Sequence, residues 1–195
     1  MTTLALARPL RSGVLVALLS LFLAGCGVNT IPTLDEQVKA AWGQVQNQFQ
    51  RRADLVPNLV ETVKGYATHE RETLDQVTAR RADVTNASGV AATAAADNAM
   101  TAMLRQLFAV AEAYPELKAN TNFLQLQDQL ASIEGELQSS RRYYNATVRD
   151  LNSEVQSFPA VLVAKPLGFA EEPFYNDDDP AIQSAPNVSF AKPAA

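Results

Sequence analysis

Apolar residues recur at seven-residue spacing along two long stretches of the chain. A repeat of seven returns to the same side of an α-helix, so it predicts helices that pack lengthwise against one another in a bundle. In the first stretch, residues 34–84, the repeat is broken once, by Glu70, and comprises Trp42, Phe49, Val56, Val63, Val77 and Val84. In the last stretch, which we expect to stop at Pro159, it comprises Leu130, Leu137, Tyr144, Leu151 and Phe158.

The first long helix has a predicted start and a predicted interruption. Thr33 followed by Glu36 forms a capping box, which indicates a helix N-terminus. Pro57 lies within the pattern, and proline removes a backbone donor and clashes with the preceding turn. The helix is therefore either kinked at Pro57 or split there, with Asp54 capping a restarted segment.

A shorter helical stretch lies between the two long ones. Residues 85–99 are small and polar, with Gly89 as a natural helix breaker, so the middle helix begins near Val90 or only after Asp97. Its apolar residues continue from Met100 to Tyr114, and Pro115 ends it. Residues 34–159 therefore predict one all-α antiparallel bundle.

The C-terminal segment, residues 160–195, has no helical period and holds five of the ten prolines. Its apolar run Ala160–Ala164 could pack back on the bundle. From Asn176 onward the chain is acidic and then rich in proline and alanine. We expect a Pro-rich, largely disordered tail.

The N-terminus has the pattern of a bacterial lipoprotein signal. A start carrying Arg8 and Arg11 leads into the apolar run Gly13–Ala24, which is shorter than the roughly 20 residues needed to span a bilayer. Leu23–Cys26 then reads as a lipobox. We expect residues 1–25 to be a signal peptide, Cys26 to be lipidated, and residues 26–33 to form a tether.

An uncleaved anchor helix is the alternative, because no charged residue lies between Ser12 and Leu34. Gly25, Gly27, Asn29 and Pro32 would make a poor second half of a membrane span. The lipobox places the bundle outside the cytoplasm, on the periplasmic side. Because Gly27 is not the aspartate of an inner-membrane lipoprotein, the outer membrane is favoured in a cell that has two.

Charge and cysteine content exclude several classes of function. The formal net charge is −5, and the expected mature chain is more acidic, about −7, because the signal holds two arginines and no acid. This balance argues against nucleic acid and against electrostatic binding to anionic lipid. With its one cysteine acylated, the chain has no thiol for disulfides, zinc or nucleophilic chemistry.

The residues indicate no catalytic, cofactor or metal site. A di-iron bundle needs two Glu-x-x-His motifs, and the single histidine, His69, follows Tyr66 by three positions. We expect His69 to be a solvated or end-capping residue. A hydrolase that uses His69 with a hydroxyl and a carboxylate is the least favoured hypothesis.

Charged residues in or beside the apolar repeat are the unusual feature of the pattern: Arg52, Glu70, Glu134 and Arg141. Buried without partners, each would cost several kcal/mol. The main interpretation is structural, with charge pairs that fix the register between helices. A second is a polar notch around Pro57, from Arg52 to Asn58, that docks a partner. A third places these residues at the ends of the bundle.

Three blocks of residues together resemble the LemA family. They are Arg52–Val60, Ala113–Asn120 and Ser140–Asn145, with matching residues around them at Ala41–Trp42, Lys64–Ala67, His69–Glu70, Asn152, Phe158–Pro159, Gly168–Phe169 and Phe174. The resemblance covers roughly residues 33–176 and implies an elongated four-helix bundle attached to a membrane at its N-terminus, without an established enzymatic role. Family members usually carry a plain transmembrane helix, whereas this chain has a lipobox.

We expect the residues of these blocks to serve partner docking or structure: Arg52, Asp54, Pro57, Asn58, Tyr114, Pro115, Arg142, Tyr144 and Asn145. The leading hypothesis is a membrane-tethered helical scaffold of the bacterial cell envelope that binds an envelope protein not identified by the sequence, with self-association also open. The alternative is an accessory of envelope proteolysis or cell-wall remodelling.

Overall fold

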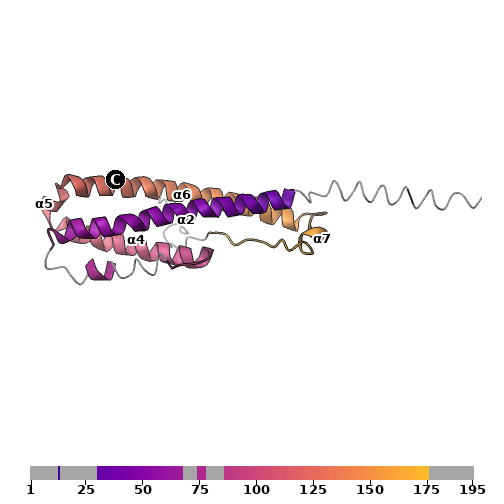
Figure 1. Ribbon diagram of the computed structural model, residues 1–195, viewed down its shortest axis with the longest axis horizontal. Helices are drawn as coiled ribbons and strands as arrows, with labels where there is room; N and C mark the ends of the chain where they lie inside the picture. The colour runs from indigo at the N-terminus through magenta and orange to yellow at the C-terminus, as the bar shows by residue number, and fades with distance from the viewer. Residues whose placement is uncertain (1–12, 14–29, 68–73, 78–85, 176–195) are drawn as a thin grey trace, which may run out of the picture. The chain divides into compact units, whose positions relative to one another are not determined.

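The computed structural model describes residue 13 and residues 30–67, 74–77 and 86–175. Its helices are α2 (Thr30–Lys64), α4 (Val90–Glu112), the short α5 (Pro115–Lys118), α6 (Thr121–Gln156) and the short α7 (Val161–Ala164) (Figure 1). Over these residues there is no strand, which confirms the all-α class. The expected signal peptide, Cys26, His69, Glu70, Val84 and the tail after Tyr175 lie outside the described residues.

The chain forms two compact units, and α2 and α6 each contribute to both. Unit 1 contains the chain up to Gly43 and residues Arg142–Pro173, and unit 2 contains Gln44–Arg141 and the chain from Phe174. In unit 1 the first part of α2 is antiparallel to the last part of α6. In unit 2 the rest of α2 is antiparallel to the first part of α6, and α4 joins them (Figure 1).

The first long helix is kinked, and it continues through Pro57. Proline has no N–H to donate to the Ala53 carbonyl, which explains a kink without requiring a break. The helix begins at Thr30, so Pro32 lies in its first turn, where proline is tolerated, and Thr33 lies inside it.

The helical pattern over 34–84 does not correspond to a single helix, because α2 ends at Lys64. The backbone N–H groups of Tyr66 and Ala67 both donate to the Val63 carbonyl, at 3.0 and 2.8 Å, and close the last turn. A separate helical turn follows at residues 74–77, where Leu74 and Val77 are buried.

The middle helix starts at Val90, the earlier of the two predicted positions. Gly89 precedes it with a φ of 83° and a ψ of 163°, a conformation open to glycine and strained for other residues. The side chain of Asn120 begins α6 by accepting hydrogen bonds from the backbone N–H of Asn122 and Phe123 at 2.9 and 3.1 Å.

The described members of the seven-residue repeats are all buried except Trp42 and Phe158. In unit 2 the buried members include Phe49, Val56, Val63, Leu130 and Leu137, and in unit 1 they include Tyr144 and Leu151. Trp42 is half-buried, and Phe158 is 72% exposed because α6 ends at Gln156, two residues before it.

The structure describes the segment after α6 up to Tyr175, and this first part of the tail expected from residue 160 is folded. The apolar run does pack inward, since Ala160 and Ala164 are buried. The chain then returns along α6 in unit 1. There the side chain of Asn152 donates to the Glu172 carbonyl at 2.9 Å and accepts from the Glu172 N–H at 2.8 Å.

Candidate functional site

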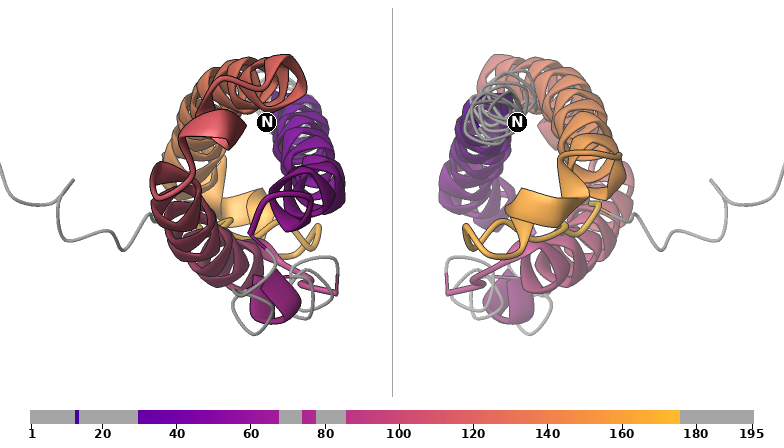
Figure 2. Two further views of the ribbon diagram at one scale, coloured as in Figure 1. Left: turned by 90° about the vertical axis from the view of Figure 1, so that its left-hand side faces the viewer. Right: turned by 90° about the vertical axis from the view of Figure 1, so that its right-hand side faces the viewer.

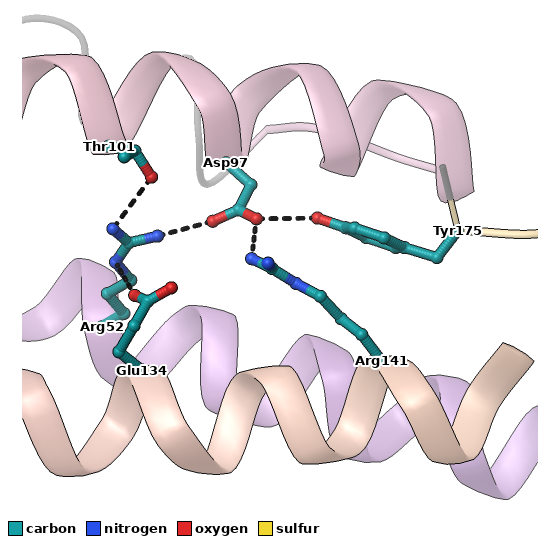
Figure 3. A network of polar contacts seen from close by, with 6 residues as sticks. All are labelled: Arg52, Asp97, Thr101, Glu134, Arg141 and Tyr175. Atoms are coloured by element: carbon teal, nitrogen blue, oxygen red, sulfur yellow. Dashed lines mark hydrogen bonds and ion pairs between the residues drawn. The ribbon is translucent and has the colours of Figure 1, made fainter. Parts of the chain in front are cut away.

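The carboxylate of Asp97, on α4 in unit 2, is the centre of a buried network of charges (Figure 3). Asp97 is 2% exposed. One oxygen, Oδ1, accepts a hydrogen bond from Nη1 of Arg52 at 2.6 Å, and Oδ2 accepts from the Tyr175 hydroxyl at 2.8 Å and from Nη2 of Arg141. The two arginines come from α2 and α6, so a single carboxylate joins three helices.

Arg52 reaches the network from α2 and is bound on three sides. Besides Asp97, its Nη2 donates to the Thr101 hydroxyl at 3.0 Å, and its Nε lies 3.2 Å from a carboxylate oxygen of Glu134. Thr101 is one turn after Asp97 on α4, which brings both acceptors to the same guanidinium. Burial lowers the pKa of Arg52 below its ordinary value, and Glu134 opposes that shift.

Tyr175 and Arg141 complete the network on the side away from Arg52 (Figure 3). The guanidinium carbon of Arg141 lies 5.0 Å from the centre of the Tyr175 ring, a cation–π distance. Tyr175 is the last residue that the structure describes, and it is 4% exposed. Its hydroxyl therefore fixes the returning C-terminal segment of unit 2 to α4.

The charges of this network balance. Two guanidinium groups face two carboxylates, and every interaction is a charge-assisted hydrogen bond, an ion pair or a cation–π contact, the stronger classes of polar contact. Buried charges are tolerated when they are paired and hydrogen-bonded in this way. The arrangement specifies which residues of α2, α4 and α6 face one another in unit 2.

An open groove lies beside the network in unit 2, between α4 and α6. Its volume is about 370 Å³, and the surface exposed to it is mostly apolar although five of its nine lining residues are polar or charged. The lining residues are Arg52, Thr101, Leu104, Arg105, Phe108, Gln127, Leu130, Ala131 and Glu134. The Phe108 ring stacks edge-on against Phe123 with 6.2 Å between ring centres, which fixes one wall. Glu134, with its side chain 33% exposed, connects the buried charges to this groove.

The residues proposed for a notch around Pro57 point in different directions. Arg52 faces the interior, whereas Asp54 and Asn58 are exposed. Asp54 accepts a hydrogen bond from Gln50 on the same helix at 2.9 Å. The structure thus places Arg52 in a buried network and the other polar residues of the motif on the outer surface of α2.

Tyr114 and Pro115 form the junction between α4 and α5. Tyr114 is the N-cap residue of α5 and Pro115 is in its first turn. Beyond α5, Asn120 donates to the Tyr66 hydroxyl at 2.9 Å and links this corner of unit 2 to the end of α2. This block of the sequence builds a helix corner.

From Arg142 onward, the third block lies in unit 1. Arg142 is exposed, Asn145 is half-buried and Tyr144 is 1% exposed. The Tyr144 ring packs on Trp42 with 5.3 Å between ring centres, and its hydroxyl donates to the Pro173 carbonyl at 2.8 Å. Burial, with Glu172 nearby, raises the pKa of Tyr144 to about 12.

Sequence reasoning singled out Arg52, Glu134 and Arg141 but missed the residues that join them. Asp97 was considered only as a possible helix boundary, and Tyr175 lies in the segment expected to be disordered. One signal was available, since two buried arginines against one nearby glutamate require a further anion. Asp97 was the acid on the middle helix able to supply it.

Neither a metal-binding cluster nor a membrane-spanning helix is found in the part of the chain that the structure describes. Residues 30–67, 74–77 and 86–175 hold no group of three or more His, Cys, Asp and Glu side chains placed to bind a metal ion. None of the helices in this part of the chain is long and apolar enough to cross a membrane.

The fold and network define an all-α protein built on long antiparallel helices that are joined by buried charges. The chain belongs to the LemA family, whose model matches residues 41–190. It is 28% identical over 136 residues to a protein named LemA from Metamycoplasma hominis, a match covering 67% of this chain and 60% of that one. It is also 22% identical over 175 residues to the magnetosome proteins MamQ 1 and MamQ 2 of Paramagnetospirillum magneticum, covering 76% of this chain and 64% of each. The chain thus spans less than two thirds of the length of these relatives.

Proposed function

We propose that this protein is a membrane-tethered interaction scaffold of the bacterial cell envelope, without catalysis of its own. The tether is the lipid expected on Cys26, and the outer face of a membrane, the outer one where there are two, is the proposed location. The bundle presents a surface of fixed shape to an envelope protein.

This proposal rests on how the buried charged side chains in and beside the apolar repeat are paired. Arg52 and Arg141, on α2 and α6, both bind Asp97 on α4 and so hold the three helices in place. The apolar groove between α4 and α6 lies directly beside them. A rigid surface with an apolar groove suits the recognition of another protein, because association is driven by burial of apolar area against a preorganised surface.

Site-specific photocrosslinking in intact cells tests this proposal. A photoreactive amino acid at Ala131, which lines the groove, is compared with one at Gln125, an exposed position on α6 about 120° around the helix. We expect Ala131 to crosslink a defined envelope protein that Gln125 does not, identified by mass spectrometry. The same diffuse products from both positions would contradict a scaffold that binds through this groove.

The identity of the crosslinked protein distinguishes a scaffold from an accessory of an envelope enzyme. A structural envelope protein is expected for a scaffold. A protease or a wall-remodelling enzyme would instead assign the protein as an accessory of that enzyme. A second copy of this chain would indicate a homo-oligomeric scaffold.

A further inference from the structure

Three large apolar side chains in unit 1 remain exposed after the chain has folded. Phe158 is 72% exposed, Leu162 is 63% exposed and Leu167 is 55% exposed. They lie within twelve residues of one another, in the segment that leaves α6 and forms α7. Exposed apolar residues that lie close together indicate a surface that contacts another protein or a membrane.

The backbone of this segment directs Leu162 away from the core of unit 1. Hydrogen bonds from Val161 N–H to the Ser157 carbonyl and from Ala164 N–H to the Ala160 carbonyl, at 2.8 and 2.9 Å, wind it into helical turns. Ala160 and Ala164 are buried on the inner face. Leu162, inside α7, precedes Ala164 by two positions, about 200° around a helix, and therefore faces outward. Phe158 and Leu167 are exposed in the turns on either side of α7.

This surface lies at the end of unit 1 where α2 begins. The two helices are antiparallel there, so the chain beyond Gln156 is next to the first turn of α2, as Figure 1 and the right-hand view of Figure 2 show. Cys26 precedes Thr30 by four residues. Even fully extended, four residues span at most about 14 Å, so a lipid on Cys26 would hold this end of unit 1 at the bilayer surface.

The charges beside the patch favour apolar contact over electrostatic attraction. Lys165 is the basic residue of the segment, and Glu171 and Glu172 follow it within seven residues. The whole chain carries a formal charge of −5. A surface of this kind would enter the boundary between headgroups and acyl chains through its leucine and phenylalanine side chains, independently of anionic lipid.

We propose that Phe158, Leu162 and Leu167 form a membrane-contacting patch that inserts into the bilayer carrying the Cys26 lipid and orients the bundle on it. The inference rests on the proposed function, because it takes the tether as given. It adds a second, non-covalent contact, so that unit 1 lies against the membrane by a defined face.

Nitroxide quenching in vesicles tests the patch on the full-length lipoprotein. Leu162→Cys is labelled with an environment-sensitive fluorophore, and the protein is reconstituted in phosphatidylcholine vesicles with or without nitroxide-labelled lipid. Leu124→Cys is the matched control, because Leu124 is also an exposed leucine, 44% exposed, but in unit 2 at the start of α6. Leu167→Cys repeats the measurement at a second patch position in case Leu162→Cys fails to fold.

We expect the nitroxide lipid to remove most of the emission at position 162 and little at position 124, with no change when anionic lipid is added. Flotation of the same vesicles reports the tether separately. Protein that floats with equal emission at both positions overturns the patch and leaves the tether intact. Protein that does not float overturns both. Crosslinking between copies through position 162, without nitroxide quenching, overturns the patch in favour of self-association.

Discussion

Nη1 of Arg52 and Oδ1 of Asp97 lie 2.6 Å apart, although 45 residues separate them in the sequence. Both side chains are less than 5% exposed, so the pair is sealed from water. A buried ion pair is sensitive to the loss of either member, because the remaining charge keeps its desolvation cost and loses its partner. In unit 2 this pair joins α2 to α4.

Asp97→Asn removes the central anion while keeping the shape of the side chain. Arg52 and Arg141 are then left facing a neutral amide. We expect the free energy of unfolding to fall by about 3–5 kcal/mol, measured by urea denaturation followed by far-UV circular dichroism. Asp128→Asn, an exposed acid on α6, is the control and should change it by less than about 0.5 kcal/mol. Equal effects of the two substitutions would show that the network does not stabilise the fold.

Arg52→Ala distinguishes a structural role from a docking role for the first block of the family pattern. Because Arg52 is buried and bound to Asp97, Thr101 and Glu134, we expect a loss of about 3–5 kcal/mol of unfolding free energy. Its neighbour Arg51 is the matched control: its side chain is 51% exposed and pairs with Glu136 at the surface, so Arg51→Ala should cost less than about 1 kcal/mol. An Arg52→Ala protein of unchanged stability that no longer binds its partner would instead support the docking role.

The same substitution at two glycines should have opposite signs. Gly89, with its φ of 83°, precedes α4 in a conformation that only glycine adopts easily, so Gly89→Ala should destabilise the protein by about 1–3 kcal/mol. Gly135 lies inside α6, where an added Cβ meets no atom within 4 Å, so Gly135→Ala should stabilise it by about 0.5–1 kcal/mol. Thermal denaturation measures both, and two changes of the same sign would contradict the assigned backbone conformations.

Tyr144 should make the stability depend on pH in the alkaline range. Its pKa is raised from 10.0 to about 12 in the fold, because burial disfavours the phenolate. The unfolded chain therefore releases this proton first, and the contribution of Tyr144 is complete below pH 10 and is lost as the pH rises toward 12. The loss at the upper end is about 2–3 kcal/mol.

Comparison with Tyr144→Phe isolates this effect from other alkaline titrations. At pH 8 the variant should be the less stable, since it lacks the hydrogen bond to the Pro173 carbonyl. As the pH rises from 10 to 12 the difference in unfolding free energy should shrink or reverse. A difference that stays constant over this range would contradict a raised pKa.

The helices were largely predictable because each has a strong local signal. The seven-residue repeat identified the buried residues of α2 and α6, and Gly89 and Pro115 identified the limits of the middle helix. The end of α2 at Lys64 was not predicted, because the apolar spacing continues to Val77. The spacing alone does not show where one helix ends and the next begins. Phe158 was misplaced for the same reason, since it keeps the spacing although α6 has already ended.

The candidate site was only half predictable because its members are distant in sequence. Arg52 and Arg141 stood out as charges beside an apolar repeat, which is a local feature. Asp97 lies among alanines and asparagine in a segment without a clear period, and Tyr175 lies in a proline-rich segment. Only the three-dimensional packing shows that Asp97 and Tyr175 meet each other and Arg141 in one network.

The intact mass of the membrane-extracted protein is the most direct test of the expected lipid on Cys26. We predict that the wild-type chain lacks residues 1–25, carries acyl chains on Cys26, and fractionates with membranes. Cys26→Ser should be released from membranes or retain its full length. If Cys26→Ser leaves both the mass and the fractionation unchanged, the N-terminal apolar run is an ordinary anchor and the lipid tether is contradicted.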